Sequence, residues 1–167
     1  MAVILITGGA RSGKSKRAEM RTRAFPGQPV YLATAEALDA EMEARIARHR
    51  ARRGTDWIER EVPLDLVPAL LATDGGGARL VDCLTLWLSN LMHAERDWER
   101  EIKELAGALP RLKSPVVLVT NEVGLGIVPD NALARSFRDA AGFMNQAIAE
   151  VADEVEFIVA GLPMKLK

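Results

Sequence analysis

The 167-residue sequence lacks several features that are typical of other classes of protein. A single cysteine, Cys83, excludes an internal disulfide framework and favours a reducing compartment. The 22 lysines and arginines nearly balance the 23 aspartates and glutamates, so the overall charge does not indicate a nucleic acid or an anionic membrane as partner. The apolar run near the start is too short to span a bilayer, and no basic segment precedes it. These absences predict a cytoplasmic protein.

The remaining composition is that of an ordinary globular protein, with 49% apolar and 27% charged residues. Its length is typical of a single domain over residues 1–167, which is enough chain to bury a core without metals or disulfides. Short apolar segments alternate with amphipathic ones along the sequence. This alternation predicts an α/β fold, in which a mostly parallel sheet has helices on both faces.

The hydrophobic periodicity gives approximate bounds for these elements. The expected strands are residues 2–7, 30–34, 57–62, 79–83, 116–119 and 155–159. The expected helices are residues 14–24, 38–53, 64–72, 84–92, 98–109 and 131–152. The last helix carries an apolar stripe that we expect in the core, formed by Leu133, Phe137, Met144, Ile148 and Val151.

A glycine-rich stretch follows the first expected strand directly. Its sequence fits the Walker A pattern of Gly, four free positions and Gly-Lys-Ser/Thr, with the residues Gly8, Gly9, Ala10, Arg11, Ser12, Gly13, Lys14 and Ser15. Glycines allow backbone N–H groups to approach a polyphosphate, and the helix beginning near Lys14 adds the positive end of its dipole. Lys14 is expected to contact the β- and γ-phosphates and Ser15 to bind Mg²⁺. The pattern predicts a nucleoside-triphosphate site, and the alternative is a glycine-rich turn without a ligand.

A phosphate-loop enzyme needs a second acid at the end of a neighbouring strand to hold the Mg²⁺ shell. Asp82 is the leading candidate because it follows Leu80 and Val81 at the expected carboxyl end of a strand. A strand-end cap or turn residue is the alternative. Glu122, with Asn121, follows the most apolar strand at the edge where ligands gather in open α/β sheets. For Glu122 a site role and a structural role remain equally open.

The two histidines differ in their surroundings. His93 lies near a helix end and is assigned no role. The arginines around His49 are Arg45, Arg48, Arg50, Arg52 and Arg53. Nearby cations disfavour protonation of an imidazole, so His49 is expected to keep a nucleophilic nitrogen near neutral pH. A partly buried structural histidine and a solvated basic helix end compete with this interpretation, and the spacing alone favours them.

Several stretches of the sequence together resemble one family. They are TGGARSGKS at 7–15, LATAEALDAEMEARIARHR at 32–50, VDCLTLWLSNL at 81–91, TNEVGLGIVP at 120–129 and GLPMKLK at 161–167. Together they are similar to the bifunctional adenosylcobinamide kinase / adenosylcobinamide-phosphate guanylyltransferase of cobalamin assembly. The resemblance covers nearly the whole chain, and its histidine and TNEVGxGIVP segments are more specific than the phosphate loop. With the resemblance, His49 becomes the favoured nucleophile.

The resemblance implies a RecA-like P-loop NTPase fold and two reactions on one corrinoid side arm. First, ATP or GTP phosphorylates the aminopropanol hydroxyl of adenosylcobinamide. A histidine then attacks the α-phosphate of GTP, pyrophosphate leaves, and the bound GMP passes to the corrinoid phosphate to give adenosyl-GDP-cobinamide. The implied partners are Mg²⁺, these nucleotides, adenosylcobinamide and its phosphate, and the implied assembly is a homotrimer.

Carried over by position, the resemblance also implies a set of site residues. His49 would be the guanylylated nucleophile, and Ser15 and Asp82 would contact the metal, although the family often has Glu where Asp82 stands. Glu61, which shares one strand face with Glu59, would contact the nucleotide. The full nucleotide-binding set would be Gly8, Gly9, Ala10, Arg11, Ser12, Gly13, Lys14, Ser15, Ala33, Thr34, Ala35, Arg50, Ala51, Arg52, Arg53, Glu61 and Asp82.

Two other functions remain open on the residues alone. One is a small-metabolite kinase that uses the same phosphate loop without a covalent step. The other is a nucleotide-dependent switch, or a nucleic-acid binder that uses the arginine cluster. The nearly neutral charge and the lack of basic segments interleaved with aromatic residues weigh against nucleic acid. A preference for guanine rests on the resemblance alone.

Overall fold

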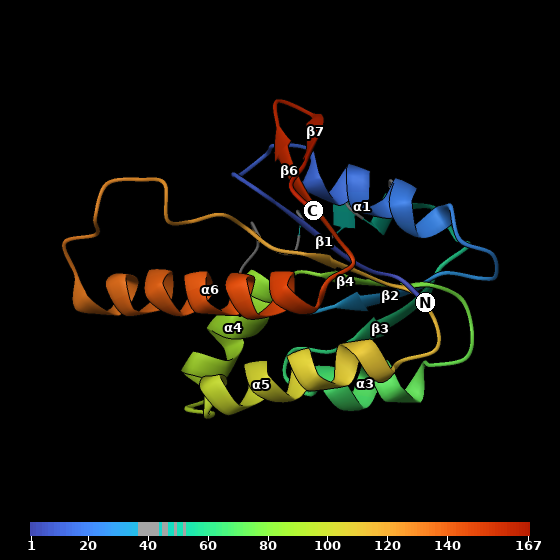
Figure 1. Ribbon diagram of the computed structural model, residues 1–167, viewed down its shortest axis with the longest axis horizontal. Helices are drawn as coiled ribbons and strands as arrows, with labels where there is room; N and C mark the ends of the chain where they lie inside the picture. Colours follow the sequence, from blue (N-terminus) through green and yellow to red (C-terminus); the bar gives the residue numbers. More distant parts are fainter. Residues whose placement is uncertain (37–43, 45–46, 49, 52) are drawn as a thin grey trace.

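The computed structural model describes residues 1–36, 44, 47, 48, 50, 51 and 53–167, and it is built around one sheet (Figure 1). The order of its strands is β3-β2-β4-β5-β1-β6-β7. All neighbouring strands are parallel except β6 and β7, which form an antiparallel pair. The strands are β1 Val3–Gly8, β2 Val30–Ala33, β3 Ile58–Glu61, β4 Arg79–Asp82, β5 Val116–Val119, β6 Glu154–Val159 and β7 Leu162–Lys165.

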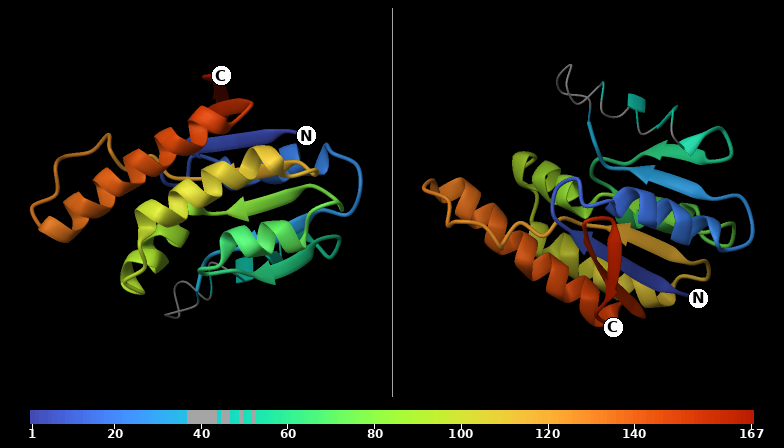
Figure 2. Two further views of the ribbon diagram at one scale, coloured as in Figure 1. Left: turned by 60° about the horizontal axis from the view of Figure 1, so that its bottom comes forward. Right: turned by 90° about the horizontal axis from the view of Figure 1, so that it is seen from above.

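Helices cover both faces of the sheet, as the alternating pattern predicts. One face carries α1, and the opposite face carries α3, α4, α5 and α6 (Figures 1 and 2). The helices are α1 Lys14–Arg23, α3 Leu66–Ala72, α4 Leu84–His93, α5 Trp98–Ala108 and α6 Ala132–Val151, with a 3₁₀ turn η1 at Leu109–Arg111. The helix predicted over residues 38–53 lies largely outside the described residues. In the described part of the chain, no helix is both long and apolar enough to cross a membrane.

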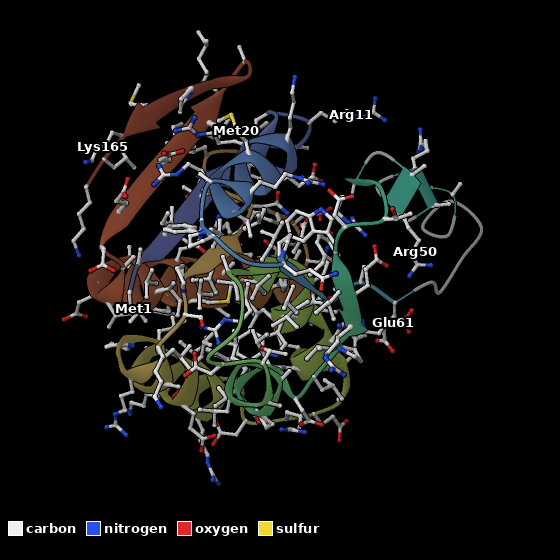
Figure 3. The ribbon with its side chains drawn as sticks, turned by 90° about the vertical axis from the view of Figure 1, so that its right-hand side faces the viewer. Met1, Arg11, Met20, Arg50, Glu61 and Lys165 are labelled. Carbon is white, nitrogen blue, oxygen red and sulfur yellow. The ribbon has the colours of Figure 1, made fainter. Side chains whose placement is uncertain are left out.

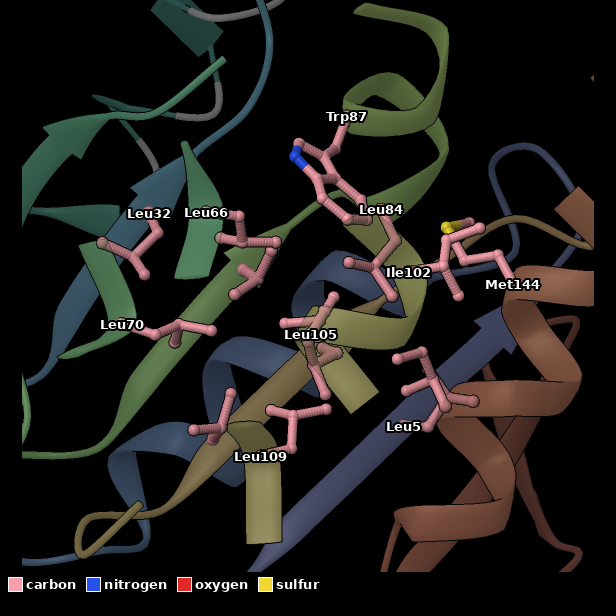
Figure 4. Packing of buried hydrophobic residues seen from close by; sticks show 14 of the residues in the cluster. Leu5, Leu32, Leu66, Leu70, Leu84, Trp87, Ile102, Leu105, Leu109 and Met144 are labelled. Atoms are coloured by element: carbon pink, nitrogen blue, oxygen red, sulfur yellow. The ribbon is translucent and has the colours of Figure 1, made fainter. Parts of the chain in front are cut away.

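The central strands β1 and β5 are buried and apolar at nearly every position because helices cover both faces of the sheet there. In β1, Leu5 belongs to the larger core beneath α3–α6, whereas Ile4 and Ile6 belong to the smaller core beneath α1. Complete burial of one such side chain stabilises the fold by about 1.5–3 kcal/mol. Figure 4 shows part of the larger core, which includes Leu66 from α3, Trp87 from α4, Leu105 from α5 and Met144 from α6.

Helix α1 is tied to β6 by ion pairs. Arg17 Nε and Nη2 donate to Glu156 Oε2 and Oε1, each over 2.7 Å. Arg21 donates to the same carboxylate and, over 2.9 Å, to Glu154 Oε1. Because α1 begins immediately after the glycine-rich stretch, these pairs also fix the position of that stretch against β6.

The predicted elements that fall within the described residues are found within about two residues of their expected bounds. Two expectations were wrong. The segment after Gly161 was expected to be a tail but forms β7, in which Pro163 lies opposite Ile158 at the edge of the sheet. Leu133 was expected in the core but is 69% exposed. The reason is that the first turns of α6 extend past the sheet, where no strand lies beneath them (Figure 1).

Candidate functional site

The six parallel strands share one carboxyl edge, and most of the predicted site residues that the structure describes lie along it. The glycine-rich stretch follows β1, and Thr34 follows β2. Asp82 is the last residue of β4, and Glu122 comes shortly after β5. The fold therefore brings together residues that are more than 100 positions apart in the sequence.

The phosphate loop, residues 8–15, has a backbone shape that depends on glycine. Gly8 has φ of 152°, and a Cβ at this residue would lie 2.5 Å from the carbonyl oxygen of Ile158. Gly13 has φ of 101°, and a Cβ there would lie 3.3 Å from Gly161 Cα. A side chain at Gly8 would force the loop away from β6, so this position requires glycine.

Two neighbouring loops hold the phosphate loop by backbone hydrogen bonds. The N–H of Glu122 donates to the carbonyl oxygen of Gly8 over 3.1 Å, and the N–H of Gly161 donates to that of Ser12 over 2.8 Å. Glu122 lies in the loop after β5, and Gly161 lies in the turn between β6 and β7. The loop is thus supported on two sides.

The polar groups of the phosphate loop suit an anion. The N-cap residue of α1 is Gly13, which has no side chain to bond the first N–H groups of the helix, and such groups bind anions. The Oγ of Ser12 is buried and has no hydrogen-bond partner among the described residues. Lys14 is only 7% exposed, and its Nζ donates to the carbonyl oxygen of Gly9 over 2.6 Å. A phosphate group in this loop would give Ser12 a partner, so the residues fit a polyphosphate.

Asp82 and Ser15 offer the oxygen ligands that Mg²⁺ prefers. The hydroxyl of Tyr31 donates to Asp82 Oδ2 over 3.1 Å. Burial, together with the nearby charge of Asp82, raises the pKa of Tyr31, so the phenol remains a donor. No group of three acidic, histidine or cysteine side chains that could hold a metal ion is found in the described part of the chain. This donor chemistry fits Mg²⁺, which usually takes one or two protein ligands and completes its shell with phosphate and water.

Thr34 joins the ends of β2 and β4. Its Oγ1 donates to the carbonyl oxygen of Cys83 over 2.7 Å and accepts from the N–H of Cys83 over 2.8 Å. The N–H of Thr34 donates to the carbonyl oxygen of Asp82 over 3.2 Å, and Asn90 Nδ2 donates to the carbonyl oxygen of Thr34 over 2.8 Å. The buried side chain of Thr34 therefore fixes the backbone of Cys83, directly after Asp82, and its backbone N–H fixes the carbonyl group of Asp82.

Two arginines of the segment 44–53, Arg50 and Arg53, bind β3 through Glu59, whereas Arg48 Nε donates to the carbonyl oxygen of Ala44 over 3.3 Å. Arg50 Nε and Arg53 Nη2 each donate to this carboxylate over 2.7 Å. Burial acts to raise the pKa of Glu59, but the hydrogen bonds from both arginines outweigh it and lower that pKa. The side chain of Glu61 is 81% exposed and lies 3.9 Å from Arg50 Nη2 (Figure 3). The sequence predicted that Glu59 and Glu61 share one face of the strand, but it did not predict that Glu59 accepts hydrogen bonds from both arginines.

Tyr31 and Trp57 are two further residues of this region, and neither was predicted from the sequence. The guanidinium of Arg53 lies 3.5 Å from the centre of the Tyr31 ring and has a side chain only 3% exposed. Trp57 packs edge-on against Tyr31, with 6.0 Å between ring centres. Nothing in the sequence pattern distinguishes Tyr31 or Trp57 from ordinary core residues.

Some predicted residues lie outside the described part of the chain, and others are exposed. His49, Arg45 and Arg52 are not among the described residues. His93 is exposed, and its Nδ1 lies 2.7 Å from the carbonyl oxygen of Ser89.

A phosphate loop at the carboxyl edge of a mostly parallel sheet, with helices on both faces, defines the P-loop NTPase fold. The flagellar accessory protein FlaH from Methanocaldococcus jannaschii superposes with a TM-score of 0.61 at 13% identity, over 99% of this chain and 78% of that one. A prototypical ATPase from the type III secretion system of pathogenic bacteria gives a TM-score of 0.56 at 12% identity, over 98% of this chain and 56% of that one. At this identity the likeness shows the fold alone.

Sequence comparison identifies the family within that fold. Residues 4–166 match the family described as Cobinamide kinase / cobinamide phosphate guanyltransferase. The chain is 51% identical to the bifunctional adenosylcobalamin biosynthesis protein CobP of Pseudomonas aeruginosa, over 98% of this chain and 96% of that protein. It is 45% identical to the corresponding protein CobU of Salmonella typhimurium, over 99% of both chains. The chain therefore belongs to the cobinamide kinase / cobinamide phosphate guanyltransferase family of transferases, which confirms the resemblance seen in the sequence.

Proposed function

We propose that this chain phosphorylates the aminopropanol hydroxyl of adenosylcobinamide and then transfers GMP from GTP to the resulting phosphate. The observation that carries this proposal is the phosphate loop, in which Gly8 and Gly13 let the backbone pack against Ile158 and Gly161 and Ser12 has a buried hydroxyl available to an anion. In a chain of this family, a triphosphate in that loop serves both reactions. The product is adenosyl-GDP-cobinamide.

The first reaction needs a phosphate held rigidly while a hydroxyl attacks it. The hydroxyl oxygen forms a bond to the γ-phosphorus, the bond from that phosphorus to the β-phosphate oxygen breaks, and the hydroxyl proton is lost. Lys14 and the N-terminus of α1 would stabilise the charge on the phosphates. The support of the loop by Glu122 and Gly161 keeps these donors in place without reorganisation during the reaction.

The second reaction would pass through His49. An imidazole nitrogen bonds to the α-phosphorus of GTP, and the bond to the bridging oxygen breaks, so that pyrophosphate leaves. A phosphate oxygen of adenosylcobinamide phosphate then bonds to the same phosphorus, and the phosphorus–nitrogen bond breaks. The local sequence supports this role because arginines surround His49, and Arg50 and Arg53 anchor the end of its segment to Glu59.

The proposed site uses the residues implied by the family. The phosphate loop would cradle the triphosphate, while the segments 33–35 and 50–53, together with Glu61, would line the nucleotide. Ser15 and Asp82 would hold Mg²⁺, which when bound neutralises charge on the phosphate oxygens. Thr34 would contribute to the site indirectly, because it fixes the backbone beside Asp82 and thereby the position of the Asp82 carboxylate.

We also infer a cytoplasmic location, on the sequence composition, and a homotrimer, on the family resemblance. The single cysteine, which is buried and free, agrees with a reducing compartment. Light scattering on the purified protein tests the assembly. A mass of one chain at working concentrations would contradict the trimer.

The covalent step is tested with GTP labelled at the α-phosphate. The wild-type chain should gain the mass of one GMP in the presence of Mg²⁺, and the label should be released by acid. His49→Ala should lose the adduct, whereas the matched control His93→Ala should keep it, because His93 is exposed and bonded within its own helix. Retention of label by His49→Ala would remove that residue from the mechanism. Transfer of γ-label to product without any α-label on the protein would instead indicate a kinase without a covalent step.

A further inference from the structure

Tyr31 stands in the middle of a chain of contacts that crosses three neighbouring strands. On one side, its hydroxyl donates to Asp82 Oδ2 at the end of β4 over 3.1 Å. On the other side, its ring lies beneath the guanidinium of Arg53, 3.5 Å from the ring centre, and Arg53 is bound to Glu59 on β3. Because β3, β2 and β4 are adjacent in the sheet, the contacts run from its edge toward the phosphate loop.

The surroundings of Tyr31 leave it little freedom. The residue is 5% exposed, and Trp57 packs edge-on against its ring. Arg23, from the last turn of α1, lies 5.2 Å above the Trp57 ring and donates to the carbonyl oxygen of Arg53 over 2.7 Å. The phenol ring is therefore held from both sides, and its hydroxyl reaches Asp82 in one orientation.

The hydroxyl of Tyr31 is not required for packing. A phenylalanine would fill the same space in the smaller core, since the apolar neighbours contact the ring. Among the described residues, the hydroxyl of Tyr31 has its hydrogen bond with Asp82. A buried donor of this kind orients a carboxylate by occupying one of its two oxygens, which leaves the second oxygen for a cation.

We propose that Tyr31 is a positioning residue, which orients the carboxylate of Asp82 for Mg²⁺ and is itself held by Arg53. This inference rests on the proposed function to the extent that Asp82 is taken as a metal contact. It assigns a role to a residue that the motif does not include. It also explains why Arg53 is buried against a ring while the other described residues of the segment 44–53 are exposed.

The test compares GTP binding with and without Mg²⁺ for Tyr31→Phe, a change that removes only the hydroxyl. Calorimetric dissociation constants for GTP are measured in EDTA and in Mg²⁺, and their ratio gives the gain in affinity due to the metal. We expect Tyr31→Phe to match the wild type in EDTA and to lose about tenfold of the gain with Mg²⁺. Thr73→Val, which removes a hydroxyl bonded to Ala69 within α3, is the control and should keep the full gain.

A double variant decides whether Tyr31 acts through Asp82. Asp82→Asn should lose the gain from Mg²⁺, and Tyr31→Phe added to it should lose no more. The inference would be overturned if the wild type and Tyr31→Phe gained the same affinity for GTP from Mg²⁺. It would also be overturned if the losses of this gain in the two single variants added up in the double variant. A wild-type chain that gains no affinity from Mg²⁺ would overturn it as well. If Mg²⁺ raises the affinity of the wild type for GTP as expected but no GMP adduct forms, the result would count against the proposed guanylyl transfer and would leave the role of Tyr31 unaffected.

Discussion

Replacing Glu156 by glutamine removes the charge that binds α1 to β6. The residue is 4% exposed, and both of its oxygens accept from Arg17 over 2.7 Å, while Arg21 binds the same carboxylate. The hydrogen bonds from Arg17, and then the charges of both arginines, lower the pKa of Glu156 despite its burial. Glutamine has nearly the same shape and keeps one acceptor oxygen, so the change acts on charge rather than on packing.

The expected loss of stability is about 2 kcal/mol. A hydrogen bond to a charged group contributes about 1.5–3 kcal/mol net. The side chains of Arg17 and Arg21 are 25% and 21% exposed, so water partly replaces the lost partner and the total loss stays near the lower end of the range for a single such hydrogen bond. For a chain of this size, such a loss lowers the midpoint of thermal unfolding by about 4–8 °C.

Urea denaturation at several pH values measures this effect. The folded-state pKa of Glu156 lies below the unfolded value of about 4.3. The ion pairs therefore contribute fully above that unfolded value, and their contribution is lost as the pH falls through the folded pKa. We expect the difference between wild type and Glu156→Gln to be constant near neutral pH and to close in acid. The control is Glu104→Gln, which breaks an exposed pair with Arg100 and should change little. A difference below about 0.5 kcal/mol at neutral pH, or one that persists in strong acid, would refute the reasoning.

Two further predictions concern the phosphate loop and the cysteine. Gly8→Ala should weaken GTP binding by about tenfold or more, because its Cβ would lie 2.5 Å from the carbonyl oxygen of Ile158 and strain of this kind costs about 1–3 kcal/mol. The control is Gly142→Ala, which should leave binding unchanged because no heavy atom lies within 4 Å of the added Cβ. Equal affinities of the wild type and Gly8→Ala for GTP in calorimetry would contradict the steric argument. Burial raises the pKa of Cys83 to about 11. Iodoacetamide at pH 8 should therefore label this thiol slowly in the folded protein and rapidly in urea. Rapid labelling of the folded protein would show that the surroundings of Cys83 open to solvent.

Sequence periodicity predicts this fold well where both faces of a strand are buried. The run Val116–Val119 is apolar at every position, and its predicted bounds agree with β5. The phosphate loop is equally visible because its Walker A pattern is contiguous in the sequence, although Gly8 and Gly13 also pack against Ile158 and Gly161. Elements of this kind carry their own signal in the local sequence.

The features that the sequence did not reveal depend on distant neighbours. Strand β7 contains Pro163 and is exposed at each position, so it lacks both the alternation and the composition of a buried strand. Leu133 has the spacing of a core residue, but whether a sheet lies beneath it depends on how far α6 extends. Glu59 and Tyr31 acquire their partners only when β3, β2 and β4 lie side by side, which no local pattern records.

The support of the phosphate loop by the β6–β7 turn has a consequence for biosynthesis. The loop is translated about 150 residues before Gly161, whose N–H donates to the carbonyl oxygen of Ser12. Strand β1 likewise waits for β6, whose residues are translated about 150 positions later. A nascent chain therefore lacks one of the two supports of the loop until β6 and the turn after it have been translated, so we expect nucleotide binding to be complete only after that point.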